Sequence, residues 1–211
     1  MSKEDGRLSP PTVLRLSEYL LILEQFIKEN KEIISSRELA QAYGNNANQV
    51  RQDIFHLENS GRVGQGYSTY ELAEEIRRTL GLSDIRRVCI VGIGNLGKAL
   101  ATHVPFSDYG MKLTAAFDTE TKVIGKTINE VIVEDYTVLA ESIKEKNIDI
   151  GAICVPSNAA QAVCDILVEA GVTGILNYSR VRLKAPEHVS IQYQQVICSF
   201  MQLSYKVSHD D

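Results

Sequence analysis

The stretch VGIGNLGKAL, residues 91–100, has glycines at positions 92, 94 and 97 in the spacing G-x-G-x-x-G. It follows the apolar run RVCI and leads into a segment with helical spacing, so the sequence predicts a strand, a tight turn and a helix. In a dinucleotide-binding fold the first glycine permits the turn, the second lets the backbone approach a pyrophosphate, and the third packs the helix on the strand. The helix N-terminus then offers free N–H groups to phosphate.

A second apolar run, KLTAAFD, ends at Asp118, which lies 21 residues after Gly97. A carboxylate at this place accepts hydrogen bonds from both ribose hydroxyls and repels a 2′-phosphate, so we expect NAD(H) as the cofactor. Lys122 lies nearby but does not follow the acid directly, which leaves NADP(H) as the less favoured alternative.

Strand-like and helix-like segments alternate through the rest of the chain. Residues 137–147 and 157–171 have helical patterns, the second capped by Ser157, whereas residues 147–156, 172–178 and 189–193 have strand patterns. The alternation predicts an α/β fold with a Rossmann-type, doubly wound parallel sheet.

Such sheets bind ligands at the carboxyl ends of their strands. The candidate cofactor-binding residues are therefore Gly92, Ile93, Gly94, Asn95, Leu96, Gly97, Asp118, Val155, Pro156, Asn177 and Tyr178, with His103 on the helix after the loop. The alternative for the segments around Val155 and Tyr178 is that they are ordinary loop starts.

The residues in front of this fold carry a different pattern. Ser9 and two prolines begin a segment with apolar residues at helical spacing, which are Leu14, Leu20, Leu23, Phe26 and Ile27. Ser35 and Glu38 then form a capping box for a short helix that Gly44 ends.

A third helix is expected after Asn46. Its apolar stripe consists of Val50, Ile54 and Leu57, and a second face of the same helix carries Asn48, Arg51, Gln52 and Phe55. A Gly-rich hairpin and one more helix follow, which begins at the second S-x-x-E, Ser68 to Glu71. This order of elements predicts an N-terminal winged helix-turn-helix.

Asn, Gln and Arg side chains match the donors and acceptors of base edges in a major groove, so the third helix favours double-stranded DNA as the partner. The candidate DNA-binding residues are Ser36, Asn48, Gln49, Arg51 and Gln52, with Arg62, Gln65 and Tyr67 on the hairpin. The alternatives are that this face is only solvated or that it binds protein. Asp53 and Glu58, on the same helix, argue against a strongly basic surface.

Composition sets limits on these interpretations. The net charge is -5, with 12 Lys and Arg against 13 Asp and Glu in residues 1–87 and 10 against 14 in residues 88–211. Any DNA contact must therefore come from a local patch on the front module. No apolar run approaches the roughly 20 residues of a membrane span, and MSKEDGRLSP has no secretory signal, so we expect a cytoplasmic protein.

The four cysteines have no C-x-x-C or other close metal-ligand spacing, so we expect no metal site and no disulfide. Cys89 and Cys154 lie in apolar runs and are expected to be buried structural thiols.

The last segment has an apolar stripe with no partner in its own chain, made of Val196, Phe200, Leu203 and Val207. Such a helix packs on another subunit, so we expect a homodimer. The predicted domains are residues 1–82 (winged helix), 83–193 (Rossmann, NAD(H)-binding) and 194–211 (dimerisation helix).

Three functions fit these features. The first is a DNA-binding regulator that senses NAD(H). The second, a small NAD-dependent oxidoreductase, needs a substrate domain, and the roughly thirty residues after Tyr178 are too few for one, so we expect no enzyme. The third is a Rossmann-type protein that binds NAD or a CoA-type ligand, with a winged helix that contacts protein.

Eight segments carry a resemblance to a known family. They are RLSEYLLILE, SSRELA, NQVRQDI, GQGY, VGIGNLGKAL, AAFD, VPSNAAQAVCDILVEAGVTGILNYS and APEHVSIQY. Over nearly its whole length the chain resembles Rex, a family of redox-sensing transcriptional repressors. The resemblance implies a homodimer with a domain-swapped C-terminal helix, which binds palindromic operators and leaves them when NADH closes its Rossmann domains. It further implies that Gly92, Gly94, Gly97 and Asp118 hold the adenosine half of the cofactor, and that Asn48, Gln49, Arg51 and Gln52 read DNA.

The chain also departs from the family pattern. His103 stands where the family usually has Tyr, while Leu21 and Gln195 stand where it has an Arg and an Asp that pair in one redox state. Arg51-Gln52 replaces a basic pair, and residues 56–58 replace a Tyr-Phe-Gly. The hypothesis that follows is a divergent Rex-like paralogue with weakened NADH/NAD+ discrimination and altered operator specificity.

Overall fold

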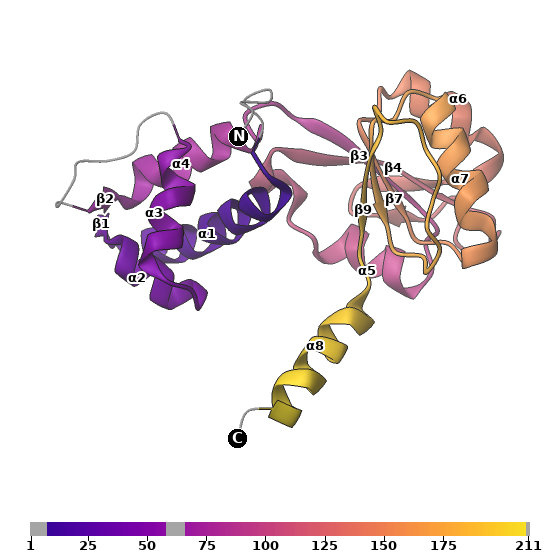
Figure 1. The fold of residues 1–211 in the computed structure, drawn as a ribbon. Coiled ribbons are helices and arrows are strands. Elements are labelled where there is room, and N and C mark those ends of the chain that lie inside the picture. The colour runs from indigo at the N-terminus through magenta and orange to yellow at the C-terminus, as the bar shows by residue number, and fades with distance from the viewer. Residues whose placement is uncertain (1–7, 58–65, 210–211) are drawn as a thin grey trace. The chain divides into compact units, whose positions relative to one another are not determined.

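A computed structural model describes residues 8–57 and 66–209 of the chain (Figure 1). The chain forms two compact units, Met1–Asp84 and Ile85–Asp211. Unit 1 contains helices α1 (Pro10–Lys28), α2 (Ser36–Tyr43), α3 (Ala47–Phe55) and α4 (Thr69–Thr79), and the short strands β1 (Ile33–Ile34) and β2 (Tyr67–Ser68).

The predicted starts of the four helices are confirmed. In each, a side-chain oxygen of the preceding residue accepts a backbone N–H from the first turn, at Ser9, Ser35, Asn46 and Ser68. These bonds satisfy donors that a helix leaves open. Gly44 ends α2 in the left-handed conformation, with φ 81°, and the short connection from Gly44 to Asn46 turns the chain into α3.

The core of unit 1 lies where α1 packs on α2, α3 and α4. Its buried residues on α1 are Thr12, Leu16, Tyr19, Leu20 and Leu23. The expected apolar stripe is wrong at Leu14, which is 59% exposed, because it points away from the line through Leu16, Leu20 and Leu23.

Strands β1 and β2 form a small antiparallel sheet in which Ile34 pairs with Tyr67. Gly66 directly precedes β2 and has φ 81°. The backbone of β1 lies so close to it that a Cβ on Gly66 would be 2.9 Å from the carbonyl oxygen of Ile34. Two predicted DNA-binding residues of the hairpin, Arg62 and Gln65, lie outside the described residues.

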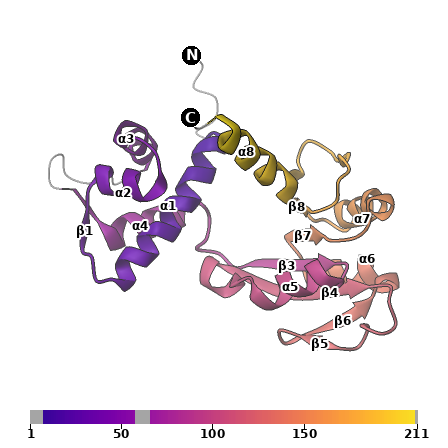
Figure 2. The same ribbon diagram turned by 90° about the horizontal axis from the view of Figure 1, so that it is seen from below.

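Unit 2 is built on a sheet in the order β5-β6-β4-β3-β7-β8-β9. The strands are β3 (Arg86–Val91), β4 (Met111–Asp118), β5 (Thr127–Ile128), β6 (Val131–Asp135), β7 (Ile150–Ile153), β8 (Gly174–Asn177) and β9 (Ser190–Tyr193). All neighbours are parallel except β5 and β6. Figure 2 shows the run from β7 through β3, β4 and β6 to β5. The six parallel strands have the order of a Rossmann sheet, and the sequence analysis did not identify β5 and β6.

Helices cover both faces of this sheet, as the predicted doubly wound fold requires. They are α5 (Asn95–His103), α6 (Leu139–Glu145) and α7 (Ser157–Glu169), with the short 3-10 helices η1 (Phe106–Tyr109) and η2 (Tyr136–Val138). Alternate residues of β3 face opposite sides, because Cys89 and Val91 pack with α6 and α7 whereas Ile90 packs with α5. Ser157 does not cap α7 as expected, since it is already the first helical residue and Pro156 precedes it.

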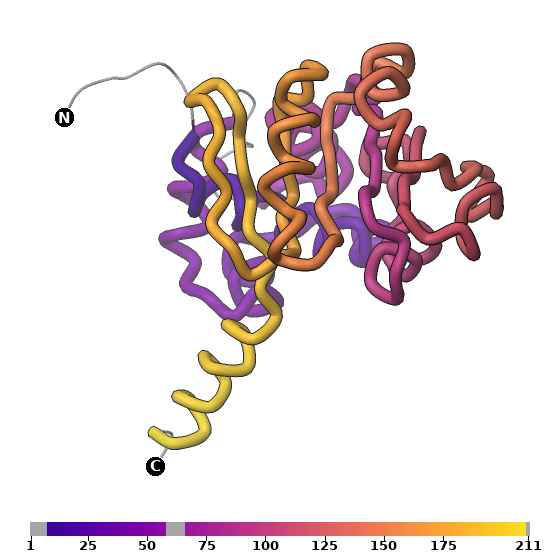
Figure 3. Tube along the Cα trace, turned by 90° about the vertical axis from the view of Figure 1, so that its right-hand side faces the viewer, coloured from indigo at the N-terminus to yellow at the C-terminus, as the bar shows by residue number. Residues whose placement is uncertain are grey.

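The last helix, α8 (Val196–His209), ends the described chain (Figure 3). None of its residues is buried, and the predicted stripe of Val196, Phe200, Leu203 and Val207 is exposed to solvent. In the described part of the chain, no helix is both long and apolar enough to cross a membrane.

The opposite placements of two leucines on α1 predict different costs of truncation. Leu20 is 1% exposed, so Leu20→Ala should lower the free energy of unfolding by about 3 kcal/mol through lost packing. Leu14→Ala, at an exposed site, should change it by less than about 0.5 kcal/mol. Urea unfolding of both variants, followed by circular dichroism, measures the difference, and equal losses would contradict the assigned helix face.

Candidate functional site

The turn after β3 can be made only with glycine at two positions. Gly92 has φ 94°, and a Cβ there would lie 2.8 Å from the carbonyl group of Cys154. A Cβ on Gly97 would overlap the carbonyl oxygen of Gly92 itself. The turn therefore holds the first turn of α5 against the end of β3, and the close approach explains the predicted roles of the first and third glycines.

The second glycine has an open side. Gly94 is the N-cap of α5, no side chain caps the helix, and a Cβ on Gly94 would meet nothing within 4 Å. Asn95 and Leu96 follow it as exposed residues of the first turn, and Ile93 before it is buried. The N-terminus of α5 thus presents backbone N–H groups and a positive dipole end at an accessible place, which suits an anion such as a phosphate.

Asp118 lies beside this turn, at the carboxyl end of β4. Its Oδ2 accepts a hydrogen bond from the backbone N–H of Ile93 at 2.5 Å, and its Oδ1 accepts one from the N–H of Glu120 at 2.8 Å. Each carboxylate oxygen keeps a second lone pair. The acid is thereby oriented next to the glycine turn, with capacity left for hydroxyl donors.

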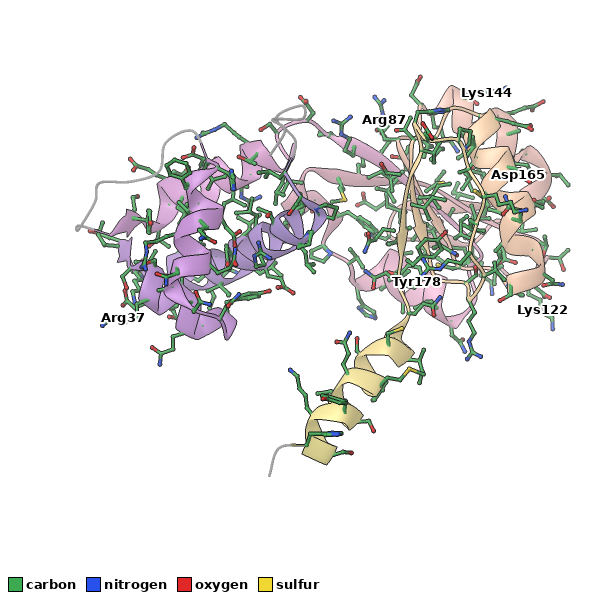
Figure 4. All side chains as sticks on the ribbon, viewed as in Figure 1. Arg37, Arg87, Lys122, Lys144, Asp165 and Tyr178 are labelled. Carbon is green, nitrogen blue, oxygen red and sulfur yellow. The ribbon has the colours of Figure 1, made fainter. Side chains whose placement is uncertain are left out.

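Lys122 lies four residues beyond Asp118 in the sequence, and its side chain is exposed. Its amine ends at the outline of the unit in Figure 4. Asp118 is held by the backbone N–H groups of Ile93 and Glu120 and not by Lys122, so the carboxylate is the charged group that is held at the turn.

The strand order brings the other predicted segments to the same edge of the sheet. β3 and β7 are neighbours in register from Val88–Ile150 to Val91–Ile153, so their carboxyl ends and following loops adjoin. After β3 the chain continues into α5 on one face of the sheet, and after β7 it continues into α7 on the other face. Ligands bind in such sheets at the place where neighbouring strands lead to opposite faces. Val155 is half-buried and Pro156 exposed at this edge.

Tyr178 follows β8 and is half-buried, with a pKa raised by burial and by the neighbouring Cys154. Cys89 is buried within β3 as predicted, and burial raises its pKa to about 12. Cys154 was expected in the core but lies one residue past β7 and is only half-buried. Its pKa is likewise raised by burial to about 12, so it stays a thiol at neutral pH.

Two of the predicted cofactor residues differ from the others. Asn177 lies at this edge, as the last residue of β8 beside Ile153, but its side chain is buried, whereas His103 lies away from the edge. Asn177 is 0% exposed, and its amide is engaged locally, accepting from the N–H of Ser179 and donating to the carbonyl of Val181. Its side chain shapes the turn after β8. His103 ends α5, about 12 Å along the helix from the glycine turn, and lines a different cleft of about 1150 Å³ with Phe106 and Lys112.

In unit 1 the predicted DNA-binding residues cluster around α3. The guanidinium of Arg51 donates to the hydroxyl of Ser36 at 3.0 Å and to the side-chain oxygen of Asn48. Gln52 is exposed on the same helix, and Tyr67 is half-buried in β2. Ser36, Asn48 and Arg51 therefore form one linked polar group at the junction of α2 and α3.

Asp53, which the sequence analysis counted as surface charge, is buried and 2% exposed. Arg15 of α1 donates to both of its oxygens at 2.7 Å, the hydroxyl of Tyr19 donates at 3.1 Å, and Gln49 donates at 3.1 Å. Burial alone would raise the pKa of Asp53, but the hydrogen bonds from Arg15, Gln49 and Tyr19 outweigh burial, so its pKa lies below the usual value.

This network corrects one interpretation, because Asp53 is not an exposed charge of the helix but the buried partner of Arg15. Gln49, a predicted DNA-binding residue, is half-buried and lines the same hollow as Asn48 and Arg51. It also holds Asp53 through its amide. The sequence held a partial signal: Asp53 follows Val50 of the apolar stripe by three residues, which places it at the border of the buried face, where an unpaired acid would be costly.

The lowered pKa of Asp53 predicts that part of the free energy of unfolding is lost at acid pH. A carboxylate whose pKa is lowered on folding stabilises the protein above its unfolded-state pKa, and this contribution is lost as the pH falls through the folded-state value. The loss should therefore lie below about pH 4. Asp53→Asn should lower the free energy of unfolding at pH 7 by about 3 kcal/mol and flatten the decline at low pH.

Urea unfolding at pH values from 7 to 2 measures both effects. Glu32→Gln, which changes an exposed acid of the same unit, is the matched control and should keep the acid-dependent decline. An unchanged pH profile in Asp53→Asn would show that Asp53 does not carry the buried charge.

Two family models match one unit each, and known relatives match nearly the whole chain. Residues 7–54 match the family model described as putative DNA-binding protein N-terminus, and residues 83–181 match the model described as CoA binding domain. The redox-sensing transcriptional repressor Rex of Caldicellulosiruptor bescii is 39% identical over 201 residues, which cover 95% of this chain and 93% of the relative. Rex of Clostridium tetani is 37% identical over 97% of both chains.

Solved structures agree with these relatives. The crystal structure of RSP, a Rex-family repressor, matches with a TM-score of 0.87 at 33% identity, over 97% of this chain and 95% of RSP. RSP in complex with β-NAD+ and operator DNA matches with a TM-score of 0.89 at 34% identity, over 97% and 94%. RSP has also been solved with β-NADH, and that structure matches with a TM-score of 0.87. The chain belongs to the Rex family of redox-sensing transcriptional repressors.

Proposed function

We propose that the chain is a cytoplasmic, non-enzymatic repressor that binds palindromic operator DNA as a homodimer and responds to NADH and NAD+. The observation that carries the proposal is the uncapped N-terminus of α5 beside the oriented carboxylate of Asp118, on the same chain as a helix-turn-helix. The family relative RSP, solved with NADH and with NAD+ and operator DNA, supports the same ligands here.

NAD(H) fits the residues that the structure places at the crevice. The backbone from Gly92 to Gly97 and the first turn of α5 would hold the pyrophosphate, and Asp118 would hold the ribose hydroxyls of the adenosine half. Val155, Pro156 and Tyr178 follow β7 and β8, where they would line the nicotinamide half. When bound, the nicotinamide supplies the redox signal, because NADH and NAD+ differ by a hydride and a positive charge.

A CoA-type nucleotide is the second candidate ligand, favoured by the match of residues 83–181 to a CoA-binding model. CoA also contains an adenosine and a pyrophosphate, so the glycine turn does not distinguish it from NAD(H). Asp118 does, because a ribose that carries a 3′-phosphate brings a second negative charge to the carboxylate. The mass of a ligand that copurifies with the chain separates the two.

The DNA-binding surface would be the exposed face of α3 in a major groove, with Asn48, Arg51 and Gln52 toward base edges and Ser36 near the backbone. Gln49, which is half-buried and lines the same hollow, would contact DNA beside them, and its amide also orients Asp53. The hairpin residues Arg62, Gln65 and Tyr67 would contact the sugar-phosphate backbone or a minor groove.

The exposed apolar stripe of α8 supports the dimer, since the described part of the chain leaves Val196, Phe200, Leu203 and Val207 uncovered. We assign residues 194–211 to a swapped dimerisation helix, residues 1–82 to DNA binding and residues 83–193 to nucleotide binding. A palindromic operator follows, because a two-fold dimer presents two identical recognition helices. A nucleotide that binds one arrangement of the dimer more tightly than the other shifts the population between DNA-bound and free protein.

Substitutions at two glycines should distinguish an effect on folding from an effect on nucleotide binding. Gly97→Ala should lower the free energy of unfolding by at least about 2 kcal/mol, because the new Cβ overlaps backbone. Gly94→Ala has space for its Cβ and should cost at most about 1 kcal/mol. It should nonetheless weaken NADH binding at least about tenfold, because it covers the backbone that a pyrophosphate must approach. Urea unfolding and fluorescence titration with NADH measure the two effects, and unchanged NADH affinity in Gly94→Ala would remove the turn from the site.

The redox response is tested by titrating NADH and NAD+ into a defined complex of the protein with duplex DNA. We expect NADH to release the DNA at a lower concentration than NAD+, by less than about tenfold, which is the lower part of the usual coupling range. The reason is that Leu21, His103 and Gln195 lack the ionic and phenolic groups that the family places there. CoA is the control nucleotide and should leave the complex intact. A preference for NADH above about a hundredfold would contradict the weakened discrimination, and release by neither form would contradict the proposed function.

A further inference from the structure

Phe55 is an aromatic residue that α3 leaves in solvent. It is the last residue of the helix and is 79% exposed, which is more than any other aromatic side chain of residues 8–57 and 66–209. Its ring contacts the adjacent His56 edge to face, with centroids 6.5 Å apart. An exposed aromatic ring at such a place is a large apolar surface that the described residues of unit 1 leave uncovered.

The position of Phe55 on α3 shows which face of the helix carries the exposed ring. Phe55 follows Asn48 by seven residues, Arg51 by four and Gln52 by three, so these four side chains share one face of α3. They line a single hollow of about 570 Å³ in unit 1. Val50 and Ile54 are buried on the opposite side of the helix. The apolar ring therefore belongs to the same surface as the polar residues proposed to contact base edges.

The chemistry of a major groove narrows what an apolar ring can recognise there. Asn, Gln and Arg pair with the donors and acceptors of bases, but a phenyl ring cannot replace any of these hydrogen bonds. The apolar feature of the major-groove code is the C5-methyl group of thymine, and an apolar side chain distinguishes thymine by contact with it. The seven residues from Asn48 to Phe55 span about 10 Å of helix, so the ring would lie about three base pairs from the bases near Asn48.

We infer that Phe55 is a specificity-determining residue whose ring packs against a thymine methyl group in each operator half-site. This inference rests on the proposed DNA-binding function. It goes beyond it by giving a role to Phe55, which is not among the DNA-binding candidates predicted from the sequence, and by naming the base that the residue requires.

The test begins with a duplex that the wild-type full chain enriches from a random pool. Each thymine of the enriched half-site is replaced in turn by deoxyuridine, which removes only the methyl group, and affinity is measured at one salt concentration. One thymine should stand out, with a loss of about fourfold for one half-site, the effect of burying one methyl group. Phe55→Ala should bind the unmodified duplex more weakly and show no further loss at that thymine. Phe55→Leu, which keeps an apolar side chain, should retain part of the effect.

Tyr70→Ala is the matched control, because it removes an exposed aromatic ring from α4 in the same unit. It should keep the wild-type loss at every thymine. If Phe55→Ala keeps the wild-type pattern of losses, or weakens binding to all duplexes equally, the ring does not recognise a thymine methyl and the inference is overturned. Unchanged DNA binding together with an altered oligomer mass in Phe55→Ala would instead assign the ring to a protein contact. A wild-type chain that enriches no sequence would overturn the proposed DNA-binding function as well.

Discussion

The close approach of Gly97 to the carbonyl oxygen of Gly92 is the constraint on which the proposed nucleotide site depends. No side chain fits between the first turn of α5 and the end of β3, so the helix begins directly on the turn. This closeness leaves the helix N-terminus at the edge of the sheet and brings Ile93 into hydrogen-bonding range of Asp118. The helix end proposed to bind phosphate and the acid proposed to bind ribose thus both follow from one close backbone approach. Neither requires a side chain from the helix itself.

Unit 1 depends on a buried charge in a comparable way. The carboxylate of Asp53 joins α3 to α1 through Arg15 and Tyr19, and a pair of this kind is costly to break because it leaves a charge without a partner. The exposed face of α3 is therefore held in one orientation by bonds on its buried side. Such preorganisation matters for base recognition, because a hydrogen bond or methyl contact discriminates between bases only when its side chain is held in place.

Each unit has a buried core, and the described residues also leave three surfaces uncovered. Unit 2 buries alternate residues of its strands against helices on both faces, whereas α8 buries none. The exposed face of α3, the N-terminus of α5 and the stripe of α8 are the three surfaces assigned here to DNA, nucleotide and a second subunit. A repressor that senses a nucleotide needs these three kinds of contact, because the ligand acts by changing how well a dimer fits its DNA.

Local rules of the sequence determined most of the elements. Capping residues predicted the starts of α1 to α4, and a glycine predicted the end of α2. The glycine spacing and Asp118 predicted β3, α5 and β4, since these signals act over a few residues. The family followed from longer motifs, and the comparisons confirmed it. The sequence alone did not reveal the edge strands β5 and β6, the exposure of Leu14, the burial of Asn177 or the distance of His103 from the glycine turn.

Only the tertiary structure decided these points, and Asp53 shows why. Along the sequence, it is an acid on a helix that was expected to contact DNA, and its spacing is compatible with surface or core. Its partners, Arg15 and Tyr19, lie 38 and 34 residues away. Burial, and with it the pKa and the role of a charged side chain, depends on which distant groups the fold brings within hydrogen-bonding distance, and periodicity within one helix does not contain that information.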